Sequence, residues 1–147
     1  MLQALITRLC DGHALRDKAL VQRLRLLLLD TAAISIASLD QPPLLELQHH
    51  RARVDSGGVQ LPGMRHRLNP AATASVLATS ACWDELVGGD ARSHGRPGLG
   101  VVPVVMALSL AQRNSLERSL MALMLGYEVA ATIGRAYQVP EGEHVDG

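Results

Sequence analysis

Residues 116–137, which read LERSLMALMLGYEVAATIGRAY, predict one long helix that packs closely against a neighbour. Ala122, Gly126, Ala130 and Gly134 are spaced by four, so on a helix they form one ridge of small side chains. Glycine weakens a helix interior by about 1 kcal/mol relative to alanine. Two glycines on this ridge therefore indicate that its backbone touches a second helix.

The remainder of the chain predicts further helices and no strand of any length. Helices are expected over residues 1–9, 15–39, 44–54, 71–86 and 101–112, in addition to residues 116–137. The segment 15–39 is apolar or small at almost every position after Leu28, which predicts burial nearly all round. Residues 41–43, Gln-Pro-Pro, should end this helix, because proline cannot continue the hydrogen-bond ladder. We therefore expect an all-α fold, a packed bundle of about six helices that forms a single domain over residues 1–147.

Two of the expected helix starts carry capping residues. Asn69-Pro70 predicts an N-cap followed by proline in the first turn. Asn114 and Glu117 fit the capping-box spacing at the start of the last helix. The glycine-rich sequence of residues 87–100 predicts a loop between two buried helices.

The charge and composition narrow the class of protein. Lys+Arg and Asp+Glu both number 14, so the formal net charge is zero. No excess positive charge is available to displace the counterions of a nucleic acid, and near-neutral proteins repel one another weakly. We therefore expect no nucleic-acid partner, and a homodimer in solution.

Two kinds of chemistry have little support in the composition. Lys18 is the one lysine, so almost no amine is available for Schiff-base or general-base catalysis. His49-His50 has no acidic or thiol side chain at metal-ligand spacing, so we expect no metal site there.

The sequence also argues against a membrane span and a disulfide framework. The most apolar segment, residues 24–39, carries Arg25 and Asp30 and is shorter than the roughly 20 residues of a spanning helix. Cys10 and Cys82 are far apart in the sequence and fit two free thiols. We therefore expect a cytoplasmic protein that does not bind membranes.

Several stretches, in order along the chain, carry a resemblance to a known family. They are LLDT at residues 28–31, the segment 69–85, RPGLGVVP at residues 96–103, GYE at residues 126–128 and GEHVDG at residues 142–147. In this order and spacing they resemble the MmgE/PrpD family, which includes 2-methylcitrate dehydratases and cis-aconitate decarboxylases. The resemblance covers most of the chain. It implies the N-terminal part of the family's helical domain, without the α+β lid domain that covers the substrate.

The same resemblance implies four site residues. His144 falls on the histidine of the family's G-x-H-x-T-G signature, although Asp146 replaces the threonine. An ungapped match puts Arg96 on the active-site histidine of the H-P-x-x-x-V-x-P stretch, and His94, two residues earlier, could take that position if the loop is longer. We therefore expect His94 and His144 to be catalytic, and Arg96 and Asp84 to bind substrate. An arginine can grip a substrate carboxylate through its planar fork of donors.

Each of these residues also has a simpler interpretation. His94 can be an exposed loop histidine, Arg96 a solvated charge, and Asp84 part of a solvated helix end. The chain departs from the family at Thr79, where the family usually has histidine, and at residues 82–85, which read CWDE where the family has D-F-D-D. These departures bear directly on the expected site.

Two functions follow from the sequence. Members of the family remove water or carbon dioxide from small polycarboxylates, or epimerise related acids, without a metal or an organic cofactor. The first expectation is the N-terminal portion of such a lyase, inactive as this chain alone, because the family's lysines, a later histidine and a tyrosine would lie beyond its end. The second is a non-catalytic helical remnant that acts as a dimerisation or interaction module. An in-frame continuation that encodes the lid domain would favour the first expectation, and a natural stop codon would favour the second.

Overall fold

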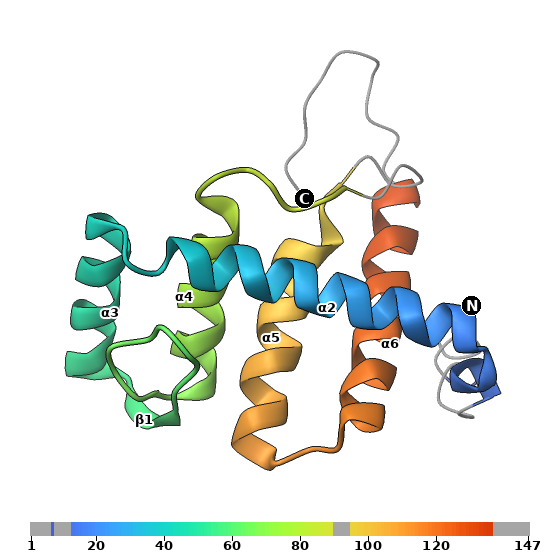
Figure 1. Ribbon diagram of the computed structural model, residues 1–147, viewed down its shortest axis with the longest axis horizontal. Helices are drawn as coiled ribbons and strands as arrows, with labels where there is room; N and C mark the ends of the chain where they lie inside the picture. The colour runs from blue at the N-terminus through green and yellow to red at the C-terminus, as the bar shows by residue number, and fades with distance from the viewer. Residues whose placement is uncertain (1–6, 8–12, 90–94, 137–147) are drawn as a thin grey trace.

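The computed structural model describes residue 7 and residues 13–89 and 95–136 of the chain (Figure 1). The described residues form the helices α2 (Lys18–Ser38), α3 (Pro42–Val54), α4 (Pro70–Cys82), α5 (Pro97–Gln112) and α6 (Leu116–Ala136). A short 3-10 helix, η1 (His13–Arg16), precedes α2, and a short strand, β1 (Ser56–Val59), forms isolated bridges with Leu68. The expected all-α fold is confirmed over these residues. The helix expected over residues 1–9 falls, apart from residue 7, outside them.

Helix α2 lies across a layer of three helices. In Figure 1, α4, α5 and α6 stand side by side and α2 crosses in front of them. α4 packs against α5, α5 packs against α6, and α2 contacts all three. α3 and β1 lie beside α4, on the side of the layer farthest from α6. α2 is therefore the element that joins the helices of the layer to one another.

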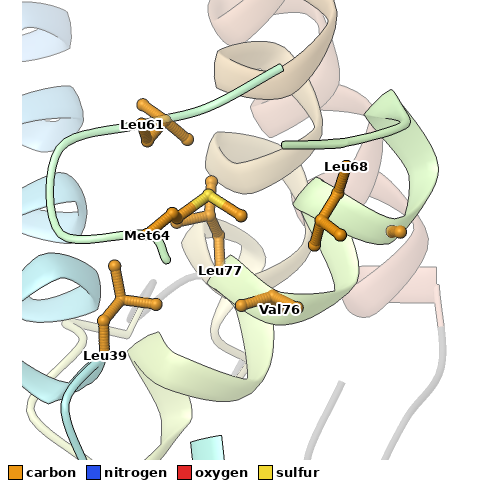
Figure 2. Packing of buried hydrophobic residues seen from close by; sticks show 7 residues of the cluster. Leu39, Leu61, Met64, Leu68, Val76 and Leu77 are labelled. Carbon is orange, nitrogen blue, oxygen red and sulfur yellow. The ribbon is translucent and has the colours of Figure 1, made fainter. Parts of the chain in front are cut away.

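The core consists of two clusters of buried apolar side chains. The first joins α4 to residues 60–68 and to the end of α2, and its members are Leu39, Leu61, Met64, Leu68, Ala72, Val76 and Leu77 (Figure 2). The second lies between α2, α5 and α6, and its members are Leu24, Val102, Val105, Leu120, Leu123 and Met124. Full burial of a leucine or valine side chain stabilises a fold by about 1.5–3 kcal/mol. These two clusters hold α2 against the layer at both of its ends.

A buried glutamine fixes the junction between α2, α3 and residues 60–68. Gln48, on α3, is fully buried. Its Nε2 donates to the carbonyl oxygen of Leu39 at 3.1 Å, and its Oε1 accepts from the backbone N–H of Arg65 at 2.9 Å. A buried amide must find partners for its polar atoms, so each bond also orients the backbone group that it meets. The irregular segment 60–68, which supplies Leu61, Met64 and Leu68 to the first core cluster, is held in place in this way.

Some helix boundaries differ from those expected. α2 ends at Ser38, and Pro42-Pro43 lie in the first turn of α3 instead of ending α2. Proline is accepted there because the first N–H groups of a helix have no partner within the helix. α4 ends at Cys82, four residues before the expected position, and α5 begins at Pro97, four residues before it. The Asn69 cap is confirmed, because its Oδ1 accepts from the backbone N–H of Ala72 at 2.8 Å.

The start of α6 corrects the expected capping box. The hydroxyl of Ser115 accepts from the backbone N–H of Arg118 at 3.2 Å. The side chain of Asn114 instead donates to Gln112 Oε1 at 3.2 Å. Arg113, which ends α5, has φ 52°, so the chain turns sharply before the cap. The cap therefore falls one residue later than the N-x-x-E pattern indicated.

The expected burial of α2 on all sides is wrong. Its inner side is buried at Leu24, Thr31, Ser35 and Ser38. On its outer side Leu29 keeps 65% of its surface exposed. The run of apolar residues therefore has an inner side that packs against the layer and an outer side that no described element covers.

The expected close approach of α6 to another helix is present at Gly126. A Cβ atom added there would lie 2.7 Å from Cγ1 of Val101 on α5, closer than real Cβ contacts come. Ala122, one step earlier on the same ridge, is exposed. The close contact therefore does not extend along the whole ridge.

No helix among the described residues is both long and apolar enough to cross a membrane.

Candidate functional site

The candidate site lies where α4 ends and α5 begins. Figure 1 shows that the C-terminal ends of α4 and α6 and the N-terminal end of α5 lie at the same end of the layer. Asp84 follows the last turn of α4, and Arg96 directly precedes α5. Two of the four expected site residues therefore belong to one end of the layer. His94 and His144 lie outside the described residues.

Asp84 is held by α2. The hydroxyl of Ser38 donates to Asp84 Oδ2 at 2.9 Å, although the two residues are 46 positions apart. The carboxylate is therefore oriented by a partner, even though Asp84 itself is exposed. A carboxylate at a helix C-terminus meets the negative end of the helix dipole, so a hydrogen-bond donor there offsets an unfavourable interaction. Asp84 is thus a paired side chain and not simply a solvated helix end.

The first turn of α5 packs tightly against α2. Gly98 is buried, and a Cβ atom added there would lie 3.4 Å from Val87 Cγ1, 3.6 Å from Thr31 Oγ1 and 3.8 Å from Leu27 Cδ1. Leu27 and Thr31 belong to α2, and Val87 to the segment after α4. The start of α5 is therefore fixed in position relative to both of its neighbours.

Thr31 brings an unsatisfied hydroxyl to this contact. Its side chain is fully buried, and its Oγ1 has no hydrogen-bond partner among the described residues. A buried hydroxyl without a partner loses the hydrogen bonds that water would supply. The contact between α2 and the first turn of α5 therefore contains a polar group with unused hydrogen-bonding capacity.

Arg96 stands at the N-terminus of α5. It is the N-cap residue of α5, its side chain makes no capping bond, and the residue is half-buried. Within the described part of the chain it forms no ion pair. The first N–H groups of a helix carry partial positive charge, which favours an anion close to the N-terminus. Arg96 therefore places a guanidinium beside the start of α5, where Pro97 has no N–H and the N–H of Leu99 donates to the carbonyl oxygen of Arg96.

The histidines and the lysine that the structure describes in a helix lie elsewhere. His49 is on α3, and its Nδ1 lies 2.9 Å from Nε2 of His66 in the segment after β1. Lys18 is in the first turn of α2, at the opposite end of that helix from Ser38. No group of three or more His, Cys, Asp or Glu side chains in the described ranges could hold a metal ion. The two expected site residues that the structure describes, Asp84 and Arg96, thus supply a carboxylate and a guanidinium, and Ser38 adds a hydroxyl.

Sequence reasoning missed the contribution of α2 to this site. Thr31, Ser35 and Ser38 are spaced by four and three, so on a helix they share one side. All three are buried in the structure. A polar stripe inside an otherwise apolar helix was the signal that could have found them, because buried hydroxyls need partners.

A groove of about 690 Å³ lies apart from these groups, between α4 and α5. Its lining residues are Asn69, Pro70, Ala71, Ala74, Ser75, Ala78, Gly100, Val104 and Leu108. No charged or titratable side chain is among them, so the groove could hold a ligand by its shape but offers no acid or base for catalysis. The α4–α5 connection remains the better candidate for chemistry.

The described residues form an all-helical domain in which Arg96 directly precedes α5 and Asp84 accepts a hydrogen bond from Ser38. A sequence model of the MmgE/PrpD N-terminal domain matches residues 5–146. The chain therefore belongs to the MmgE/PrpD family, and the match is to the family's N-terminal domain. No curated protein and no solved structure matches the chain.

Proposed function

We propose that this chain is the N-terminal helical portion of a lyase that acts on small polycarboxylates, within the dehydratase, decarboxylase and epimerase chemistry of its family. The observation that carries the proposal is Arg96, which is half-buried at the α5 N-terminus and forms no ion pair within the described ranges. A guanidinium without a carboxylate partner beside a helix N-terminus favours a bound carboxylate.

Binding would use the two described site residues differently. The Arg96 guanidinium would donate two parallel hydrogen bonds to one substrate carboxylate, and the α5 N-terminus would add its partial positive charge. Asp84, oriented by Ser38, would accept a hydrogen bond from a substrate hydroxyl. A polycarboxylate that also carries a hydroxyl group would then be held at two points.

The chemistry would be removal of a proton from a carbon next to a carboxylate. His94 and His144 would act as general acid and base, and Arg96 would stabilise the negative charge that develops on the carboxylate. A guanidinium does not release its proton at neutral pH, so Arg96 would bind and stabilise but would not transfer protons. No metal and no organic cofactor enters this proposal.

The second candidate function is a non-catalytic module that dimerises or binds a fuller relative. It is favoured by Arg96 itself, which stands at the family's histidine position in the ungapped match, and by the exposed apolar side of α2. Self-association as a homodimer is common to both candidates. So is a cytoplasmic location, where the exposed free thiol of Cys82 would stay reduced.

Ligand titration tests the lyase proposal at its binding step. Citrate, 2-methylcitrate and cis-aconitate would be titrated into the purified chain and followed by calorimetry and by NMR of the backbone amides. We expect shifts at the first turn of α5 and weaker binding in Arg96→Gln. Arg118→Gln is the matched control, because Arg118 is an exposed arginine at the opposite end of the layer.

Equal binding by the wild type and Arg96→Gln would remove Arg96 from the proposed substrate site. The absence of binding by all three acids, in a chain that still self-associates, would favour the non-catalytic module.

A further inference from the structure

We propose that the outer side of α2 is the surface through which two copies of this chain associate, α2 against α2. The surface consists of Leu26, Leu29, Ala33 and Ala37, which we call the α2 stripe. Leu26 is 55% exposed and Leu29 is 65% exposed. Both alanines are also exposed. The proposal rests on the self-association common to both candidate functions and is independent of any lyase activity.

The stripe is continuous and accessible. Its members are spaced by three, four and four residues, so they follow one side of a helix. In Figure 1, α2 lies in front of α4, α5 and α6, and its opposite side is turned away from the layer. Two such helices could therefore meet without displacing a described element.

Charged residues border the stripe in a pattern that fits a second copy. With Leu26 and Leu29 at the a and d positions of a heptad, Arg25 takes position g and Asp30 takes position e. Residues at g and e lie on opposite edges of the a/d seam and pair across it in coiled coils. The outer side of α2 thus carries an apolar seam with a basic residue on one edge and an acidic residue on the other.

Neither charge is neutralised within the described part of the chain. Arg25 and Asp30 have no oppositely charged residue three or four positions away on α2. Neither takes part in an ion pair, and both are exposed. A pair of unpartnered opposite charges beside exposed leucines is what an interface between identical helices would use.

Both directions of pairing satisfy this pattern. In a parallel arrangement Arg25 lies opposite Asp30 of the partner subunit, twice in each dimer. In an antiparallel arrangement like edges meet, and Arg23, which is on the same edge as Asp30 and seven residues earlier, lies opposite Asp30 of the partner subunit. Asp30 is therefore central to either arrangement, and the two differ in which arginine it meets.

The groove between α4 and α5 is the competing surface. It also exposes apolar side chains, among them Val104 and Leu108. No charged residue lines it. Electrostatic complementarity is what fixes the register and the choice of partner at an interface, and only the α2 stripe offers it here.

Sedimentation equilibrium of the full 147-residue chain tests the surface. We expect the wild type to dimerise, Leu29→Glu to weaken the dimer by about 100-fold, and Leu108→Glu to leave it unchanged. Leu29 and Leu108 are both exposed leucines in the middle of a helix, so the two variants are matched. Circular dichroism and thermal melting of each variant check that its fold is intact.

Charge reversal tests the pairing and its direction. Asp30→Arg should weaken the dimer by about tenfold, because two attractive pairs become repulsive. Restoration by a second change, Arg25→Asp, supports the parallel arrangement, and restoration by Arg23→Asp supports the antiparallel one.

Other results would overturn the inference. A wild-type chain that is monomeric at its highest soluble concentration removes self-association altogether. A dimer that resists Leu29→Glu but not Leu108→Glu moves the interface to the α4–α5 groove. If Asp30→Arg weakens the dimer and neither second change restores it, the charge pairing is wrong.

Discussion

At Gly126, α6 approaches α5 so closely that one added carbon atom has no room. We expect Gly126→Leu to lower the free energy of unfolding by about 1–3 kcal/mol, because overpacking forces the two helices apart. Gly126→Ala should be destabilising too, since its Cβ would lie 2.7 Å from Val101 Cγ1. Urea denaturation followed by circular dichroism measures both changes.

Gly100 provides the matched control for this prediction. It also lies in a helix, but an added Cβ atom there would meet nothing within 4 Å. Gly100→Ala should leave stability unchanged or raise it by up to about 1 kcal/mol, through helix propensity alone. Val101→Ala should recover part of the loss in Gly126→Ala. Equal stabilities of Gly126→Leu and the wild type would show that the α5–α6 contact is not as close as described.

The buried amide of Gln48 gives a second prediction at this scale. Gln48→Leu keeps the volume of the side chain and leaves the Leu39 carbonyl and the Arg65 N–H without their partner. We expect a loss of about 1–3 kcal/mol in the free energy of unfolding, which is the penalty for unsatisfied buried groups. Gln41→Leu, at an exposed position whose side chain makes no capping bond, is the control. A similar small effect in both variants would contradict the role of Gln48.

Single residues were predictable from sequence where their chemistry is local. The cap of Asn69 acts on a residue three positions away, and the smallness of Gly126 is visible in a helical repeat. The contact between Ser38 and Asp84 could not be predicted in this way, because the two residues are 46 positions apart in the sequence. Gln48 likewise bonds a residue 17 positions away. Such pairs depend on the packing of whole helices, which periodicity does not determine.

At the scale of elements, the sequence predicted helices better than it predicted their ends. Proline was expected to stop α2, yet Pro42-Pro43 begin α3. Proline is found both just after the end of a helix and in the first turn of a helix, so its position alone does not distinguish the two. The burial of α2 was also overestimated. An apolar run shows that some side of a helix is buried, but it does not show whether a second layer covers the other side.

The start of α6 can be tested by comparing neighbouring positions. Ser115→Ala should lower the free energy of unfolding by about 0.5–2 kcal/mol, because the backbone N–H of Arg118 loses its cap. Asn114→Ala should have a smaller effect, since its side chain bonds only Gln112. Thermal and urea denaturation of the two variants give the two changes in the free energy of unfolding. A larger loss for Asn114→Ala would restore the capping box that the sequence indicated.

At the scale of the whole molecule, the fold class and the family follow from the sequence, while the site residues remain predictions. The family motifs located Asp84 and Arg96, and the structure brings both to one end of the layer. The partner of Asp84 and the unsatisfied hydroxyl of Thr31 come from α2, which the motifs did not connect to the site. The roles of Asp84, Arg96, His94 and His144 all remain predictions from the resemblance.

We expect the 147-residue polypeptide to have no dehydratase or decarboxylase activity. Its described site groups are Asp84, Ser38 and Arg96, and Lys18 lies at the other end of α2. Arg96 does not release its proton at neutral pH, so proton transfer would depend on His94 and His144. To measure turnover, the purified polypeptide would be incubated with 2-methylcitrate, citrate and cis-aconitate, and alkene absorbance and carbon dioxide release would be monitored. Turnover that disappears in His94→Ala or His144→Ala would show that a working site is present.

The position of α2 in the chain also has a consequence for synthesis on the ribosome. α2 is made early, but the helices that cover its inner side, α4, α5 and α6, emerge later. For example, the backbone carbonyl oxygen of Ser35 accepts a hydrogen bond from the hydroxyl of Ser80, which is 45 positions further along the chain. Until those helices leave the exit tunnel, most of the inner side of α2 lacks the helices that bury it, and apolar surface exposed in this way is where nascent chains aggregate or recruit chaperones. Among the described helices α6 is the last to be made, so part of the inner side of α2 stays uncovered until α6 has emerged.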